Sequence, residues 1–323
     1  MLPSNASEPK ERAATVATGC PACGSALHAA ELRAEDPYSR DAFEVVRCRE
    51  CRLAYVNPRP TPEHLQRYYP DDYYGARHPF FRDFLADLRV SALGPAPAGA
   101  RILDIGCGRG DFILACRRRG FAVGGVEQAG SPVMRLRETL GIEVVTPDEI
   151  AKLPGGAFDF VTLWHVLEHL PEPRESLGEV ARLLGPGGRL LVEVPNFGSW
   201  QARLGRAYWY HMDVPRHLLH FDRPSLAALL ARTGFAPERW HTFSLEYDTF
   251  GLAQSMLNRL CKNPNHLFQL LTGKPTARSA RDTLLSFALL APVGLLAGAI
   301  SLAAALAGRG GVLRVIARKQ GRA

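Results

Sequence analysis

A carboxylate followed by three alternately spaced glycines is the first group of residues in this sequence that could do chemistry. Asp104 lies near the end of an apolar stretch, and Gly106, Gly108 and Gly110 follow it at alternate positions. Glycine adopts positive φ angles and has no Cβ, so the backbone of such a turn can approach a bound ligand closely. A helix is expected directly behind the turn, over residues 111–118, and helix N-termini bind ligands beside turns of this kind. The stretch therefore predicts a cofactor site at the end of a strand.

Charge and spacing indicate which cofactor this is. The dinucleotide fingerprint requires glycine or alanine where this chain has Asp111. Asp104 would repel a pyrophosphate, but it would attract a ligand that carries an ammonium and a sulfonium. Glu127 ends the next expected strand, about 20 residues on, where an acid binds ribose hydroxyls. These residues resemble the class I S-adenosylmethionine-dependent methyltransferases, and we therefore expect S-adenosylmethionine as the cofactor.

Strands and helices alternate from Arg101 onward, which predicts an α/β fold with a doubly wound, Rossmann-like parallel sheet. The expected strands are 101–105, 122–127, 143–145, 158–164, 189–195, 235–243 and 311–319. The expected helices after the first are 131–141, 173–184 and 222–234. The methyltransferase resemblance implies that the last strand returns antiparallel beside the sixth. An insertion, residues 246–310, separates these two strands in the sequence.

Four of the seven cysteines form two C-x-x-C pairs, Cys20 with Cys23 and Cys48 with Cys51. Two such pairs complete a tetrahedral zinc site, because each pair lets two thiolates bind the same ion. Buried free thiols would not explain the paired spacing, and a redox C-x-x-C would stand in a βαβ context that is absent here. We expect a closed, structural zinc ribbon without chemistry of its own, in a reducing compartment.

Histidines follow the fourth expected strand. The carboxyl ends of parallel strands meet where ligands bind, so Trp164 and His165 are expected at the edge of the cofactor pocket. His165, Glu168 and His169 would share one face at helical spacing. For Glu168 and His169, hydrogen bonding across the sheet edge is the alternative to a functional role.

Residues 196–221 form a connection that is long for a compact domain and is rich in histidine and aromatic residues. We expect it to fold over the methyl end of the cofactor and to contact the acceptor. Residues 214–221 are similar to a segment of sugar methyltransferases with zinc-binding N-termini, which implies that His217 lies beside the acceptor. Those that methylate carbon have a glutamate before this histidine. Arg216 stands there in this chain, which weakens carbon methylation and leaves oxygen and nitrogen acceptors open.

A hydroxyl acceptor has to lose its proton, and an imidazole suits this work. We expect His217 to be the general base, with His165 and His220 as alternates. The alternative is that these histidines are structural.

The net charge of +7 is concentrated at one end of the chain. From Thr283 onward there are five basic residues and no acidic one, so the first 282 residues carry only +2. This distribution argues against a broad nucleic-acid-binding face and favours a basic cluster beside a membrane. The polar N-terminus does not resemble a secretory signal.

The insertion contains an uncharged stretch, residues 284–308, that is long enough to cross a hydrocarbon core of about 30 Å. Pairing of the last strand with the sixth would return both ends of the insertion to one side and exclude a single span. Pro292 and Gly294 could break the stretch, so we expect a re-entrant hairpin or an in-plane helix pair, joined by the amphipathic residues 250–260. Flanking basic residues place both ends on the cytoplasmic face. A buried helical cap, a dimer interface and a single-pass helix are the alternatives.

The sequence thus divides into six expected segments. They are a disordered tail (1–19), the zinc ribbon (20–57), a helical connector (58–100), the methyltransferase core (101–245), a hydrophobic, membrane-associated helical insertion (246–310) and the last strand with a basic tail (311–323).

The expected function is methyl transfer from S-adenosylmethionine to an oxygen or nitrogen of a membrane-linked sugar, glycolipid or polysaccharide precursor. The expected partners are this acceptor and the membrane surface, not nucleic acid. One alternative is a methyltransferase for a quinone-type lipid. Another is a zinc-ribbon adaptor with an inactive methyltransferase fold, against which the intact Asp104 and Glu127 speak.

Overall fold

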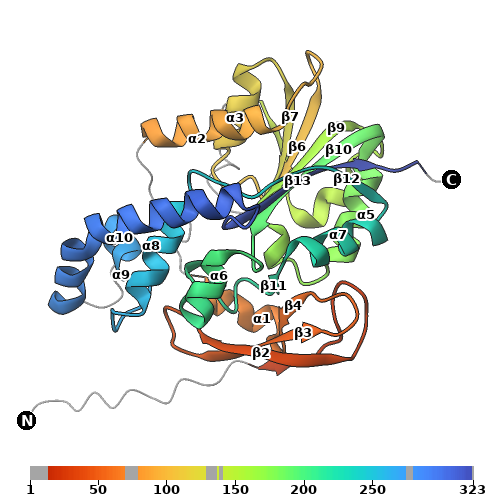
Figure 1. Cartoon of the computed structure of the whole chain (residues 1–323). Coiled ribbons are helices and arrows are strands. Elements are labelled where there is room, and N and C mark those ends of the chain that lie inside the picture. Colours follow the sequence, from red (N-terminus) through yellow and green to blue (C-terminus); the bar gives the residue numbers. More distant parts are fainter. Residues whose placement is uncertain (1–13, 70–78, 129–136, 138–140, 274–278, 322–323) are drawn as a thin grey trace, which may run out of the picture.

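A seven-stranded sheet forms the centre of the computed structural model, which describes residues 14–69, 79–128, 137, 141–273 and 279–321. The strand order is β12-β13-β10-β9-β6-β7-β8 (Figure 1). Strand β13 runs antiparallel to both of its neighbours, and the other adjacent pairs are parallel. The expected Rossmann-like sheet and its antiparallel last strand are confirmed. The strands are β6 (Arg101–Ile105), β7 (Ala122–Val126), β8 (Glu143–Val145), β9 (Phe158–Trp164), β10 (Leu184–Pro195), β12 (Phe235–His241) and β13 (Val312–Lys319).

Helices cover both faces of this sheet because successive strand residues point to opposite sides. Ile102 and Phe160 pack under α2 (Pro79–Ala92) and α3 (Asp111–Arg118). Leu103 and Val161 belong to the core that includes α5 (Pro173–Leu183) and α7 (Arg223–Arg232). Short 3₁₀ turns, η2 (Pro147–Lys152) and η3 (Leu167–His169), follow β8 and β9. The helix expected over 131–141 falls largely outside the described residues.

The N-terminal cysteine region forms a second, antiparallel sheet of four strands with the order β11-β4-β3-β2. Its first three strands in sequence are β2 (His28–Glu35), β3 (Ala42–Cys48) and β4 (Ala54–Val56). A small pair, β1 (Thr15–Val16) with β5 (Arg59–Pro60), and the short helices α1 (Pro62–Leu65) and η1 (Gln66–Tyr68) lead toward the core. We call residues 14–60 the ribbon.

The fourth strand of the ribbon sheet comes from far along the chain. Strand β11 (Leu219–His220) pairs with β4, with Leu219 opposite Tyr55. The expectation that residues 196–221 form one long loop is therefore wrong. The segment contains helices of its own and ends as an edge strand of the ribbon sheet. Before β11 it contains α6 (Trp200–Gly205), η4 (Arg206–Tyr208) and η5 (Tyr210–Met212).

The insertion forms a helical layer beside the sheet, built from α8 (Asp248–Asn258), α9 (His266–Leu271) and α10 (Ala280–Leu306), as Figure 1 shows. The break expected at Pro292 is wrong, since α10 is one helix of 27 residues that contains this proline. A helical proline frees a carbonyl one turn earlier. Pro292 and Ala288 are both exposed, so the disturbance falls on the outer side, while Ser286 and Ala297 are buried on the packed side.

Candidate functional site

The glycine turn connects β6 to α3 in the conformation that the sequence predicts. Gly106, Gly108 and Gly110 all have positive φ, at 70°, 58° and 80°. Gly106 has a second constraint, because a Cβ at this position would collide with the Val166 side chain. The residues after β9 therefore lie directly against the turn.

Two carboxylates stand at the ends of adjacent strands beside this turn. Glu127 follows β7 and accepts hydrogen bonds from the backbone N–H groups of Gly108 (2.6 Å) and Gln128 (2.8 Å). Asp104, near the end of β6, is buried and accepts a hydrogen bond of 2.6 Å from the Thr162 hydroxyl. Burial raises the pKa of Asp104 to about 7, although the Thr162 hydrogen bond and the charge of Arg89 oppose the shift. Among the described residues no basic side chain forms an ion pair with Asp104, so the site suits a cationic ligand.

These residues fit S-adenosylmethionine. Asp104 supplies a buried negative charge, Gly106 lets Val166 pack against the turn, and Glu127 supplies a carboxylate at the neighbouring strand end. The structure thus brings five of the seven residues expected at the cofactor, Asp104, Gly106, Gly108, Gly110 and Glu127, to one edge of the sheet.

Trp164 is also at this edge, but its side chain is buried among other groups. Its ring lies 5.4 Å from that of Phe112 and is flanked by the guanidinium groups of Arg89 and Arg314, each 5.4 Å from it. Its indole N–H has no hydrogen-bond partner among the described residues. The sequence does not reveal these contacts of Arg89 and Arg314, because no pattern connects two residues so far apart to Trp164.

His165 lies between two buried carboxylates. Its Nδ1 is 3.3 Å from Glu168 Oε1 and its Nε2 is 3.2 Å from Glu193 Oε1. Burial lowers the pKa of His165, but Tyr247, Glu168 and Glu193 together raise it well above the ordinary value. Its backbone has a φ of 55°, so the helical spacing expected for residues 165–169 begins only at η3. With both ring nitrogens facing carboxylates, His165 has no free lone pair for an acceptor proton.

His217 and His169 are oriented in the same way. His217 Nδ1 is 2.8 Å from the backbone oxygen of His211, and His169 Nδ1 is 2.9 Å from that of Arg216. Each backbone oxygen can only accept, so each Nδ1 donates and each Nε2 is left free. The two rings meet edge to face with centroids 4.7 Å apart.

Glu168 lies beside both of these rings and is buried. Its Oε1 is 4.0 Å from His217 Nε2, and neither carboxylate oxygen has a hydrogen-bond partner among the described residues. Three possible metal-donor atoms lie within 4.8 Å of one another here, one from each of Glu168, His169 and His217. The sequence marks all three residues as candidates, but it contains no signal that they meet.

Arg216 anchors this group to the ribbon. Its guanidinium is fully buried and contacts Asp36 Oδ1 at 2.7 Å, Asp213 Oδ1 at 2.6 Å and the Tyr68 carbonyl at 2.5 Å. Asp36 belongs to the ribbon, whereas Asp213 belongs to the segment before β11. The Arg216 side chain therefore links the ribbon to the chain segment that contains His217.

His220, the other alternate base, is in β11. Its side chain is buried, with its ring 5.4 Å from that of Phe197, and its Nε2 has no hydrogen-bond partner among the described residues. Burial, together with the nearby His217, lowers the pKa of His220 to about 3.

The four predicted zinc ligands come together at one end of the ribbon. The sulfurs of Cys20 and Cys51 are 3.4 Å apart, those of Cys23 and Cys48 are 3.6 Å apart, and all four lie within 4.8 Å of one another. Zinc–sulfur bonds of about 2.3 Å in a tetrahedron separate the sulfurs by about 3.8 Å. The thiol set therefore fits a zinc ion.

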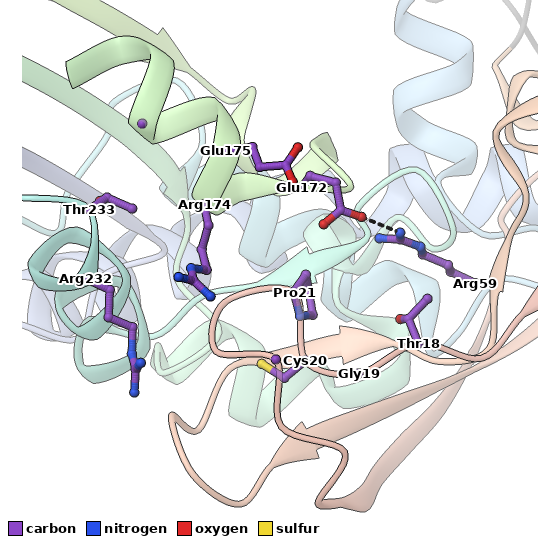
Figure 2. Close-up of a pocket in the computed structure, with 12 residues that line it drawn as sticks. Thr18, Gly19, Cys20, Pro21, Arg59, Glu172, Arg174, Glu175, Arg232 and Thr233 are labelled. Atoms are coloured by element: carbon purple, nitrogen blue, oxygen red, sulfur yellow. Dashed lines mark hydrogen bonds and ion pairs between the residues drawn. The ribbon is translucent and has the colours of Figure 1, made fainter. Parts of the chain in front are cut away.

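A cavity of about 640 Å³ lies between the cysteine end of the ribbon, α5 and α7 (Figure 2). Its rim carries charges of both signs, including Arg174, Arg232 and the ion pair between Arg59 and Glu172. Apart from Cys20, no residue expected at the cofactor, acceptor or zinc lines it. The chemistry is therefore expected at the carboxyl edge of the sheet and not in this cavity.

The chain is similar to known methyltransferases. A family model described as a methyltransferase domain matches residues 77–239, about half of the chain. A ubiquinone biosynthesis O-methyltransferase of Pseudomonas aeruginosa is 36% identical over 106 residues, which are 31% of this chain and 46% of that protein. A protein of the same name from Cronobacter sakazakii is 34% identical over 164 residues, 46% of this chain and 66% of its own length.

The chain thus spans about half the length of the first of these relatives. Among solved structures, a SAM dependent methyltransferase from Archaeoglobus fulgidus matches with a TM-score of 0.47 and 21% identity, over 73% of this chain and 94% of its own. With the family model covering the glycine turn, both carboxylates and His217, the chain belongs to the methyltransferase-domain family and is an S-adenosylmethionine-dependent methyltransferase.

Proposed function

We propose that this methyltransferase methylates an oxygen of an acceptor that is anchored at a membrane surface. The observation that carries the proposal is the buried pair of Glu168 and His217, whose Oε1 and Nε2 atoms are 4.0 Å apart. Glu168 lies behind β9 on the segment that packs against the glycine turn, and His217 lies just before β11. An acceptor hydroxyl bound there would lie next to the cofactor edge and next to groups that favour loss of its proton.

The residues of the chain have separate roles in this proposal. Asp104 would hold the cationic part of S-adenosylmethionine, and Glu127 would bind its ribose hydroxyls. When bound, the cofactor supplies a methyl group that is already activated by the sulfonium. The protein therefore has mainly to position the acceptor and to assist removal of its proton.

His217 is the residue on which activation of the hydroxyl depends. Its Nδ1 donates to the His211 carbonyl, so Nε2, which is 4.0 Å from Glu168 Oε1, keeps its lone pair for the acceptor proton. His165 is less suited to this role, since both of its nitrogens face carboxylates. His220 remains the alternate.

The anchoring part of the proposal rests on the outer face of α10. This face exposes large apolar side chains over most of the length of the helix, namely Leu284, Phe287, Leu290, Leu295, Leu296, Leu302 and Leu306. Among the described residues, α10 is the one helix long and apolar enough to cross a membrane. Its opposite face packs on α8, so we propose that α10 lies in the surface of the bilayer and does not span it. The exposed Arg281 and Arg309 at its two ends favour the anionic cytoplasmic leaflet.

A sugar hydroxyl on a lipid-linked precursor is the first candidate acceptor. The groups around His217 are polar and charged, with Glu168, His169 and Asp213 close by, which suits a hydroxyl-rich ligand. The second candidate is a phenolic hydroxyl of a quinone-type lipid, which the names of the relatives favour. Both would reach the site from the membrane.

We further propose that the ribbon binds one structural zinc ion through Cys20, Cys23, Cys48 and Cys51. Zinc would hold the ribbon in the form that pairs with β11. It would have no part in the chemistry.

The acceptor can be identified with purified protein, labelled S-adenosylmethionine and lipid extracts. We expect label in a lipid-linked glycan, with mass spectrometry placing the added methyl group on a sugar oxygen. Label on a phenolic lipid would support the second candidate, and label on nitrogen or carbon would contradict the proposal. Calorimetry with S-adenosylmethionine tests the remaining rival, an inactive adaptor, which would not bind the cofactor.

A further inference from the structure

We infer that Glu168, His169 and His217 bind a divalent metal ion at the carboxyl edge of the sheet. This site is separate from the four cysteines of the ribbon. The inference deepens the proposed function and rests on it for one point only, the role of the ion beside the acceptor hydroxyl.

The donor atoms are already close to the arrangement that a metal ion needs. His217 Nε2 is 4.0 Å from Glu168 Oε1, and the three residues offer donor atoms that all lie within 4.8 Å of one another. Metal–nitrogen and metal–oxygen bonds of about 2.1 Å hold neighbouring donors about 3 to 3.5 Å apart. Small side-chain rotations would therefore close the three donors around one ion.

Both histidines are fixed as metal-binding histidines usually are. A ligating imidazole generally donates its other N–H to a carbonyl or a carboxylate, which sets its tautomer and its orientation. His217 does so to the His211 carbonyl at 2.8 Å, and His169 does so to the Arg216 carbonyl at 2.9 Å. Arg216 in turn is held by ion pairs with Asp36 and Asp213. Contacts outside the proposed site thus fix the tautomer of both histidines.

Glu168 supplies an independent observation. Its side chain is 1% exposed, and its Oε1 forms an ion pair with His165 Nδ1 at 3.3 Å. Among the described residues Oε2 has neither a hydrogen bond nor an ion pair. A buried carboxylate oxygen without a partner is costly. A bound cation would satisfy the carboxylate.

The donor set indicates the class of metal. Two imidazole nitrogens and one carboxylate suit Zn²⁺, Mn²⁺ or Fe²⁺, whereas Mg²⁺ and Ca²⁺ prefer oxygen donors alone. Three protein ligands leave positions open for another oxygen ligand, and a metal ion there would favour ionisation of a hydroxyl. His217 would then act on the acceptor through the metal ion and would not itself be the base.

Mn²⁺ provides a selective probe, because thiolate sites such as the ribbon favour softer ions. The full-length, zinc-loaded protein is titrated with Mn²⁺ and followed by electron paramagnetic resonance. We expect one bound Mn²⁺ per chain, with affinity reduced at least about tenfold in Glu168→Gln and in His169→Gln. His241→Asn, at an exposed histidine of β12, is the matched control and should bind like the wild type. The zinc content of the ribbon, counted by mass spectrometry, shows that each variant has folded.

Absence of Mn²⁺ binding in the wild-type protein, or equal binding in the Glu168 and His169 variants, would overturn the inference. Failure of the proposed function gives a different result. A protein that binds Mn²⁺ at this site but methylates no oxygen refutes the proposed function alone. One that methylates oxygen without binding Mn²⁺ refutes the metal site alone and leaves His217 as the base.

Discussion

At the scale of single residues, Asp104 and Glu127 differ in the hydrogen bonds and the burial of their carboxylates. Glu127 accepts two backbone hydrogen bonds, whereas Asp104 has the Thr162 hydroxyl and a pKa raised by burial to about 7. An unfolded aspartate has a pKa of about 3.9. Protonation of Asp104 therefore stabilises the ligand-free protein, an effect fully present below about pH 4 and lost as the pH rises through 7. A cationic cofactor should select the ionised carboxylate and reverse this dependence.

We predict that S-adenosylmethionine raises the melting temperature more at pH 8 than at pH 6. Asp104→Asn should weaken cofactor binding on the order of tenfold or more and remove most of this pH dependence, since it removes a charge-assisted contact. Asp83→Asn, at an exposed acid of α2, is the control. Thermal shift measurements with and without the cofactor test this, and equal shifts at both pH values in the wild-type protein would contradict it.

Gly106→Ala is predicted to cost more than an alanine at another left-handed glycine. The two positions have nearly the same φ, 70° at Gly106 and 71° at Gly187. At Gly187 a Cβ would meet nothing, whereas at Gly106 it would collide with Val166. Both variants should lose about 1 to 2 kcal/mol of stability from the backbone conformation. Only Gly106→Ala should also lose cofactor affinity in calorimetry, and similar affinities in the two variants would count against the turn as the cradle.

At the scale of elements, α10 shows how one proline can be accommodated within a long helix. The sequence predicted that Pro292 would interrupt the helix. A proline disturbs a helix least, however, when the carbonyl that it frees faces outward. The buried residues Ser286 and Ala297 flank it on the packed side, so contacts with the neighbouring helices continue past it. The resulting single helix presents a continuous apolar face.

Charges on that face should prevent membrane binding. Leu295 is 78% exposed and Leu302 is 60% exposed. We predict that wild-type protein sediments with vesicles of phosphatidylglycerol and phosphatidylcholine, and that Leu295→Lys with Leu302→Lys reduces binding at least about tenfold, since each leucine contributes about 1.5 to 3 kcal/mol when buried. Leu204→Lys, at an exposed leucine of α6, should have little effect. Wild-type protein that stays in the supernatant, or that uses this face to form dimers, would refute the membrane proposal.

At the scale of the whole molecule, the ribbon is joined to the rest of the chain through β11 and Arg216, next to His217. The sequence predicted the sheet well, because glycine turns, capping residues and alternating apolar segments are local signals. It could not predict that Leu219 pairs with Tyr55 or that Arg216 reaches Asp36, because a two-residue strand and a single ion pair leave no periodic pattern. For the same reason Glu168 and His217 were identified separately, and only the fold brings them together.

This joint predicts that the ribbon supports methyl transfer without supporting cofactor binding. Cys48→Ser with Cys51→Ser should remove the zinc, lower the melting temperature and reduce methyl transfer at least about tenfold, because Asp36 and β4 would no longer hold Arg216 and β11. Affinity for S-adenosylmethionine should remain, since Asp104 and Glu127 belong to the other sheet. Cys261→Ser, outside the ribbon, is the control. Unchanged transfer in a zinc-free ribbon variant would show that the two parts work independently.

The most direct test of the central claim is the rate of methyl transfer to the acceptor oxygen by wild-type protein and by His217→Ala. Affinity for S-adenosylmethionine is measured in parallel. We predict that the wild type transfers one methyl group to a hydroxyl of a membrane-anchored acceptor, and that His217→Ala keeps its cofactor affinity but transfers at least about a hundredfold more slowly. An undiminished rate in His217→Ala, or a wild type that binds the cofactor and methylates no oxygen, would contradict the proposed function.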